Sequence, residues 1–207
     1  MSNDEETLRE LKDITRNKED WKSNIYDVAV KLDENHSIAV NAKVLWLLGE
    51  MGLKHPVEIA EYVSDIASYL DDDSPKLRER STNALGRIGR ADKNIVIPYM
   101  ARLMEMKDDE SGDVRHAFIW ACENIAVNAP ELFCEKLDIF YDLIFDLHEK
   151  VRMEAPEMFR VIGKRNPGCV KPYLEKLERI SINDEHPVVR IHSAGAVRMT
   201  KKALNEE

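Results

Sequence analysis

The chain has 207 residues, 43% of them hydrophobic and 33% charged, and its formal net charge is −9. This balance is typical of a soluble globular protein, and the acidic excess argues against a general nucleic-acid binder, which usually carries a basic surface. The N-terminal residues are polar and acidic, without the apolar stretch of a signal peptide, and no run of about 18 apolar residues predicts a membrane span. We therefore expect a soluble, cytoplasmic protein with no membrane partner.

The three cysteines are odd in number and far apart in the sequence: Cys122, Cys134 and Cys169. Their spacing matches neither a disulfide framework nor a zinc site. We expect reduced thiols, no bound metal and no other cofactor.

The first predicted helix covers residues 4–16, where Leu8 and Leu11 recur at helical spacing. It lies outside the repeat that follows. A short amphipathic helix in this place is typical of a cap over the first unit of a repeat protein.

The rest of the chain repeats itself. With Leu77 as position zero, the equivalent residues are Val40, Val114, Val151 and Val189, at intervals of 37, 37, 37 and 38 residues. No strand-like alternation occurs, so each repeat is predicted to hold two helices. The predicted repeats form one domain over residues 1–207 and span residues 18–53, 54–90, 91–127, 128–165 and 166–204.

The second helix of each repeat has apolar residues four, seven, eight and eleven positions after zero, which predicts one buried stripe. In the first repeat these residues are Val44, Leu47, Leu48 and Met51. Three positions before zero, a predicted N-cap is filled by Ser37, Ser74, Ser111, His148 and His186. Twelve positions after zero, a left-handed C-cap is predicted at Gly52, Gly89 and Gly163.

The first helices are predicted over residues 21–32, 57–70, 95–106, 131–147 and 170–180. Pro98 and Pro172 share a position inside them. A proline there removes a backbone hydrogen bond, so we expect a bend.

An acidic residue stands five positions before zero and an arginine one position after it. The pairs are Asp72 and Arg78, Asp109 and Arg115, Asp146 and Arg152, and Asp184 and Arg190. In stacked repeats such residues alternate in space, and the planar guanidinium can bridge carboxylates on both sides. Because the pair recurs in every internal repeat, we predict a structural ladder rather than a catalytic site.

These features resemble the HEAT repeat family, and most closely the short HEAT-like repeats first recognised in phycobilin lyases. The segments that carry the resemblance are IVIPYM and CVKPYL in the first helices, the acidic loop, and the V-R start of the second helix. It covers nearly the whole chain after residue 17. It implies an all-α, right-handed α-solenoid of the armadillo/HEAT type, with five two-helix repeats and an N-terminal capping helix. In this family the second helices usually line a concave face that binds proteins.

Trp46 and Trp120 both lie six positions after zero, off the buried stripe. The same position is polar or glycine in the other repeats, so these side chains are predicted to lie on the concave face, where tryptophan is a frequent binding residue. The alternative is that each indole only covers the neighbouring repeat.

The second-helix segments 76–91, 111–127, 148–165 and 187–202 carry 15 basic and 6 acidic residues, against the acidic whole. This predicts a basic groove on an acidic body, although basic residues near helix C-termini also occur without any ligand. The predicted partner-binding residues are Trp46, Asn83, Arg87, His116, Trp120, Arg160, Lys164 and Arg198.

The expected function is a non-enzymatic protein-binding scaffold for an acidic or helical segment of a protein. The alternative is a nucleic-acid-binding module that uses the same basic groove. Enzymatic alternatives among HEAT-like proteins fit less well. A deoxyhypusine hydroxylase would need several His-Glu dyads, and His148–Glu149 is one dyad placed before a helix. A DNA glycosylase also uses a basic groove, and a bilin lyase has similar repeats, but no catalytic residue of either enzyme can be matched to a residue of this chain.

Overall fold

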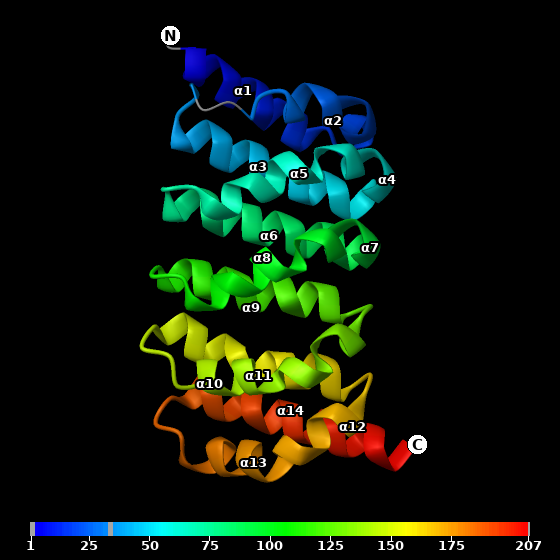
Figure 1. Cartoon of the computed structure of the whole chain (residues 1–207), viewed down its shortest axis with the longest axis vertical. Helices are drawn as coiled ribbons and strands as arrows, with labels where there is room; N and C mark the ends of the chain where they lie inside the picture. The colour runs from blue at the N-terminus through cyan, green and yellow to red at the C-terminus, as the bar shows by residue number, and fades with distance from the viewer. Residues whose placement is uncertain (1–2, 33–34, 207) are drawn as a thin grey trace. The chain divides into compact units, whose positions relative to one another are not determined.

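The computed structural model describes residues 3–32 and 35–206, and all of their regular structure is helical (Figure 1). The chain packs as two compact units, residues 1–106 and 107–207. The boundary falls inside the third predicted repeat, between its two helical segments, and each unit has a core of its own. No helix among the described residues is long and apolar enough to cross a membrane.

The first unit begins with the predicted cap. Helix α1 packs on both α2 and α3, and α3 packs along α6 (Figure 1). The elements of this unit are α1 (Asn3–Arg16), η1 (Lys18–Asp20), α2 (Trp21–Ala29), α3 (Ile38–Lys54), α4 (Pro56–Ile59), η2 (Ala60–Tyr62), α5 (Val63–Ser68), η3 (Tyr69–Asp71), α6 (Pro75–Ala91), α7 (Lys93–Val96), η4 (Ile97–Tyr99) and α8 (Met100–Glu105).

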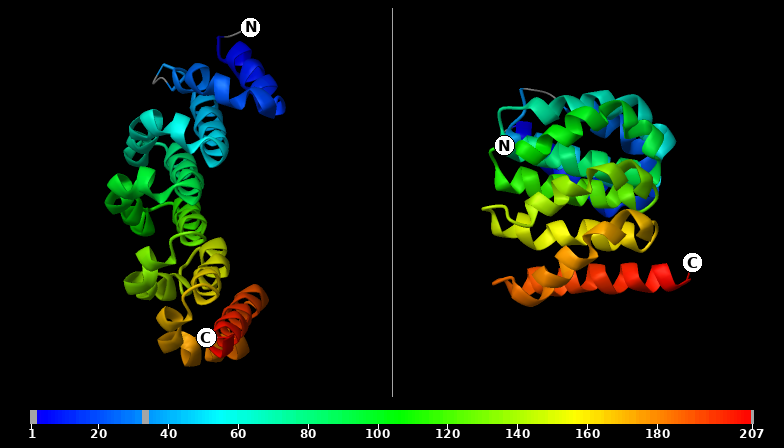
Figure 2. Two further views of the ribbon diagram at one scale, coloured as in Figure 1. Left: turned by 90° about the vertical axis from the view of Figure 1, so that its right-hand side faces the viewer. Right: turned by 60° about the horizontal axis from the view of Figure 1, so that its bottom comes forward.

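In the second unit, α11 packs against both α9 and α14, and the shorter helical segments form a second row beside them (Figure 2). A 3-10 turn, η5 (Met106–Asp108), spans the boundary between the units in sequence. The elements that follow are α9 (Gly112–Ala126), η6 (Pro130–Lys136), α10 (Leu137–Leu143), α11 (Glu149–Gly163), α12 (Pro167–Val170), η7 (Lys171–Tyr173), α13 (Leu174–Asn183) and α14 (Pro187–Glu206).

The predicted stripe of the second helices forms the core of each unit, as the periodicity requires. In α3 the four stripe residues are fully buried, and so are their counterparts in α9. The buried residues are Val44, Leu47, Leu48 and Met51 in α3, and Phe118, Ala121, Cys122 and Ile125 in α9. This prediction is confirmed.

The first helices are less regular than predicted. Each of the four that follow α3 is divided into short α and 3-10 segments, and Pro98 lies inside η4 while Pro172 lies inside η7. The prolines therefore interrupt the helix instead of bending it, because they cannot donate the hydrogen bond that an α-helix needs there. The same interruption at η2, which contains no proline, shows that packing also favours it.

The predicted N-cap positions are confirmed, but the capping hydrogen bonds expected of the serines are wrong. Ser37, Ser74 and Ser111 stand at N-cap positions, but their side chains make no capping hydrogen bond. In the loops before α6 and α9, the serine backbone N–H donates to the aspartate two residues upstream. Ser74 N donates to Asp72 Oδ1 (2.8 Å), and Ser111 N donates to Asp109 Oδ1 (2.8 Å). The turn thus satisfies its amides before the helix begins.

The predicted glycine C-caps are also wrong. Gly52, Gly89 and Gly163 lie within helices α3, α6 and α11, and no described glycine has a positive φ. Gly52 instead allows close packing, since a Cβ atom added there would meet the Ile88 side chain at 2.5 Å. Gly52 thus marks a helix contact inside α3, and Gly163 is the last residue of α11 without the left-handed conformation of a C-cap.

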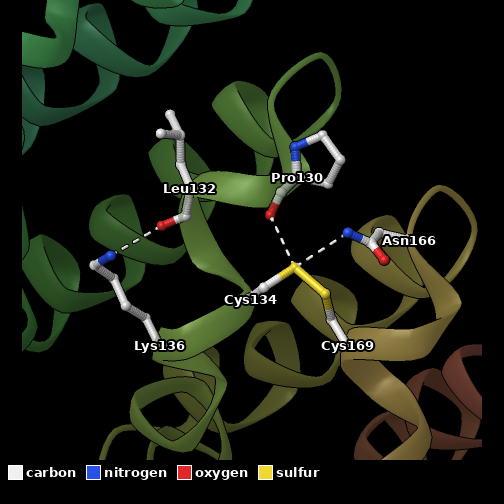
Figure 3. Close-up of a disulfide and its surroundings, with 6 residues drawn as sticks. All are labelled: Pro130, Leu132, Cys134, Lys136, Asn166 and Cys169. Atoms are coloured by element: carbon white, nitrogen blue, oxygen red, sulfur yellow. Dashed lines mark hydrogen bonds between the residues drawn. A yellow bond between two sulfur atoms is a disulfide. The ribbon is translucent and has the colours of Figure 1, made fainter.

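The cysteine prediction is corrected as well. Cys134 and Cys169 form a disulfide in the second unit (Figure 3), while Cys122 is a buried free thiol. The two bonded residues are 35 positions apart, close to the repeat length, so they occupy neighbouring positions on successive repeats. The period could have revealed this proximity.

Candidate functional site

A hollow in the first unit lies on the surface shared by α3 and α6. It has a volume of about 710 Å³ and is lined by Ile38, Ala39, Ala42, Lys43, Trp46, Lys76 and Arg80. We call this the α3–α6 groove. Its walls combine small apolar side chains, one indole and three cations, and none of the described lining residues is acidic.

Two of the three cations have no acidic partner within the part of the chain that the structure describes. No carboxylate among the described residues pairs with Lys43 or Arg80, whereas Lys76 pairs with Glu79 (Nζ–Oε2, 2.6 Å). Burial, and then the positive charge of Arg80, lower the pKa of Lys43. Two like charges that face each other without a counterion favour binding of an anion, which would relieve their repulsion.

Trp46 gives the groove its aromatic wall. It is half-buried, and Lys43 Nζ lies 4.0 Å from the ring centroid. The ammonium group over the indole face orders both side chains. Ile38 is 52% exposed at the rim, so the groove also offers apolar surface to a ligand.

Lys43 and Arg80 were not among the predicted partner-binding residues. Both lie three positions after zero, Lys43 in the repeat of Val40 and Arg80 in the repeat of Leu77. Equivalent positions on stacked helices become neighbours, so the repeat register contained the signal. The register does not show which of these cations pair with a carboxylate and which do not.

The other predicted residues of the first unit differ in their surroundings. Arg87 is paired, with its Nε 2.8 Å from Glu50 Oε1, and Asn83 is half-buried on α6. Neither lines the α3–α6 groove. Arg87 is thus neutralised locally, in contrast to Arg80.

The second unit holds the remaining predicted residues. Trp120 is half-buried on α9, and its backbone carbonyl accepts from Asn124 Nδ2 (2.9 Å). His116 Nε2 lies 3.9 Å from Glu154 Oε2 on α11. Trp46 belongs to the other unit, and binding of one partner by both indoles stays a prediction.

The surroundings of Arg160 are acidic rather than basic. Arg160 pairs with Glu157, and it also stabilises the charges of Glu123 and Glu154. Burial, followed by the negative charges of Glu154 and Glu157, raises the pKa of Glu123 well above its usual value. Its Oε1 atom is shielded from solvent and has no hydrogen-bond partner among the described residues. This face of α9 and α11 would repel an acidic ligand.

Lys164 and Arg198 are exposed at the C-terminal end of α11 and on α14. Neither residue lines the hollow beside α10 and α13 or the smaller one beside α10 and η5. Their role in binding stays a prediction.

A second large hollow, of about 590 Å³, lies in the second unit beside α10 and α13. Part of its positive charge is compensated by carboxylates. Arg152 lies 3.6 Å from Asp184 and 3.2 Å from Glu185, and Lys176 Nζ lies 4.6 Å from the Tyr141 ring centroid. It therefore has less attraction for an anion than the α3–α6 groove.

The aspartates of the predicted ladder hold their own loops. Each carboxylate accepts from the backbone N–H two residues later, at 2.7–2.8 Å. The four are Asp72, Asp109, Asp146 and Asp184. This interaction fixes the turn that precedes each second helix.

The arginines join each loop to structure outside it. Arg115 Nε and Nη2 donate to the two oxygens of Asp146 (2.8 and 2.7 Å), and Arg115 Nη1 donates to the Asp109 carbonyl (2.7 Å). Arg78 and Arg190 likewise donate to the carbonyls of Asp72 and Asp184. The recorded bonds of Arg115 therefore join one carboxylate to a loop backbone, rather than the two carboxylates that the sequence predicts.

Comparison with known proteins gives the fold and no more. No protein-family model and no curated protein matches the chain. A crystal structure of an engineered protein from the Northeast Structural Genomics Consortium superposes with a TM-score of 0.67 at 13% identity, covering 87% of this chain and 81% of that chain. A second engineered protein from the same consortium gives 0.64 at 14%, covering 86% of this chain, which spans about half (47%) of that longer chain. At such identities the likeness shows a shared helical fold.

Proposed function

We propose that this chain is a non-enzymatic, cytoplasmic binding module of the HEAT type, a right-handed α-solenoid whose α3–α6 groove holds an acidic segment of a partner protein. The observation that carries the proposal is the pair of cations, Lys43 and Arg80, that face the groove without acidic partners. A ligand carboxylate would supply the missing counterion.

The lining of the groove favours a peptide segment over an isolated anion. Beside the cations stand Trp46 and the exposed Ile38, which can bury apolar side chains of the ligand. Tryptophan and arginine are the residue types most often responsible for binding energy at protein interfaces. An acidic residue flanked by apolar ones matches this combination.

The overall charge supports selectivity for an acidic ligand at one place. The whole chain carries −9, so most of its surface repels an acidic partner at long range. The groove is a local exception, whereas Arg160 in the second unit is surrounded by three glutamates. Such a contrast would direct the ligand to α3 and α6.

The test is fluorescence anisotropy with a labelled peptide of alternating glutamate and leucine. We expect Trp46→Ala to weaken binding by about 30-fold, which corresponds to ~2 kcal/mol. Arg80→Glu should weaken it at least as much, because it replaces an unpaired cation by an anion. Lys12→Glu makes the same charge change on an exposed part of α1 and should leave the affinity unchanged.

Two further ligands separate the alternatives. A peptide with glutamine in place of glutamate should bind at least tenfold more weakly, and equal affinity for the two peptides would refute the proposal. A single-stranded oligonucleotide tests the nucleic-acid alternative, since its affinity would fall steeply with salt. Binding of the oligonucleotide alone, lost in Arg80→Glu, would replace our proposal by that alternative.

A further inference from the structure

The disulfide of the second unit joins two short segments of successive repeats. Cys134 lies in η6 and Cys169 in α12, with their Cα atoms 5.3 Å apart (Figure 3). Both cysteines are half-buried, whereas Cys122 is fully buried and burial raises the pKa of its thiol well above its usual value. Partial exposure makes the bonded pair accessible to thiol reagents, and the pair thus differs from Cys122 in reactivity.

The surroundings of Cys134 suit a reduced sulfur as well as a bonded one. The Pro130 carbonyl oxygen lies 3.6 Å from Cys134 Sγ, and Asn166 Nδ2 lies 3.4 Å from the same atom (Figure 3). A disulfide sulfur has no hydrogen to donate, so the carbonyl gains a donor only when Cys134 is a thiol. The Asn166 amide can donate to the sulfur in either state, and most strongly to a thiolate.

We propose that Cys134 and Cys169 are a reversible thiol–disulfide site that exchanges with small thiols of the glutathione class. A thiolate attacks one sulfur of the pair, forms a mixed disulfide and releases the other sulfur as a thiolate. A second thiol then attacks the mixed disulfide. The balance is one protein disulfide and two thiols giving a protein dithiol and one small-molecule disulfide, with two electrons and two protons transferred to the protein.

The geometry assigns different roles to the two sulfurs. The hydrogen bond from Asn166 stabilises negative charge on Cys134, which makes Cys134 the better leaving group. The incoming thiol therefore attacks Cys169, and the mixed disulfide forms there. Asn166 acts as a positioning residue, because it influences the reaction through the charge on Cys134.

Reduction removes a covalent link between two layers of the second unit. The bond closes a loop of 35 residues, and loops of such length restrict the unfolded chain appreciably. We expect the melting temperature to fall by at least about 5 °C on reduction. The link belongs to the second unit and the α3–α6 groove to the first, so this inference does not rest on the proposed function.

The experiment equilibrates the folded, full-length protein in mixtures of reduced and oxidised glutathione, followed by alkylation and mass measurement. We expect a reversible two-thiol transition between the oxidised and reduced forms. Cys122→Ala is the matched control and should keep the transition, while Cys134→Ser and Cys169→Ser should each abolish it. With oxidised glutathione, Cys169→Ser should form an adduct at Cys134 faster than Cys134→Ser forms one at Cys169, because the Asn166 hydrogen bond favours the Cys134 thiolate.

Asn166→Ala tests the role of the hydrogen bond. We expect its disulfide to be reduced several-fold more slowly by glutathione, with a melting temperature in the oxidised state close to that of the wild type. The proposal is overturned if the native protein never forms the bond in oxidised glutathione. It is equally overturned if the bond, once formed, is reduced only after unfolding.

Discussion

Replacement of Arg115 by alanine tests an Asp–Arg pair that is more buried than Arg152–Asp184. The side chains of Arg115 and Asp146 are 17% and 9% exposed, and two parallel hydrogen bonds join them. The same guanidinium holds the carbonyls of Asp109 and Glu110. Alanine would leave all of these acceptors without their donor.

The expected loss is about 3 kcal/mol of unfolding free energy. Breaking a fully buried pair costs ~3–5 kcal/mol, whereas an exposed pair contributes ~0–1 kcal/mol. The Arg115–Asp146 pair lies toward the buried limit, but the Asp146 carboxylate keeps its bond from the His148 backbone N–H (2.7 Å), so we take the lower end of the buried range. Arg115→Lys should recover only part of the loss, because lysine cannot bond both carboxylate oxygens in the same way.

Urea denaturation monitored by circular dichroism measures the effect as a lower midpoint at an unchanged slope. The control is Arg179→Ala, which breaks a pair with Glu175 whose side chains are 74% and 76% exposed, and which should cost less than about 1 kcal/mol. Equal stabilities for the two variants would refute the argument from burial.

The same pair predicts a dependence on acid. Burial raises the pKa of Asp146, but the hydrogen bonds from Arg115 and from the His148 amide outweigh it and keep the pKa below its usual value. A lowered pKa gives stability that is present above the unfolded-state pKa and is lost as the pH falls through the folded-state pKa. The difference between wild type and Arg115→Ala should therefore shrink below about pH 4.

Two further predictions concern the second unit. Burial, and then a hydrogen bond to Asp138, raise the pKa of Tyr173 to about 12. The stability that the protonated Tyr173 contributes is therefore complete below pH 10 and is lost as the pH rises toward 12. Tyr173→Phe should cost about 1 kcal/mol of unfolding free energy at neutral pH and remove a late step from the phenolate absorbance titration. Gly163→Ala should destabilise by ~1–3 kcal/mol in thermal unfolding, because the new Cβ would collide with Thr200, whereas Gly168→Ala meets no atom closer than 3.9 Å and should be tolerated.

The second helices could be predicted from the sequence because several local signals agree. In α6, Pro75 begins the helix and the apolar stripe continues through Ile88, and the structure has the helix from Pro75 to Ala91. The first helices were predicted less well, since their 3-10 interruptions occur with proline at η4 and without it at η2. Packing between rows decides the latter case, and no local pattern records it.

The candidate site likewise has one feature that local sequence predicts and one that only the packed structure reveals. The position of Trp46 off the buried stripe follows from helical periodicity alone, and the structure leaves it half-buried. Whether a cation is free depends on which carboxylate reaches it across neighbouring helices. Arg80 has none among the described residues, while Arg160 is bound by Glu157, although both looked alike in the sequence.

The connection from Arg115 and Arg152 to the loop of the following repeat has a consequence for how such a chain can change in length. Arg115 reaches Asp146, 31 residues ahead, and Arg152 reaches Asp184, where one additional residue in the repeat is accommodated by a second contact to Glu185. The loops at Asp146 and Asp184 each provide their own amide acceptor and receive a cation from the preceding copy. Duplication of one whole repeat, with its arginine and its aspartate loop, would therefore create a junction whose polar groups are already paired. The gene can gain or lose such repeats without a compensating mutation.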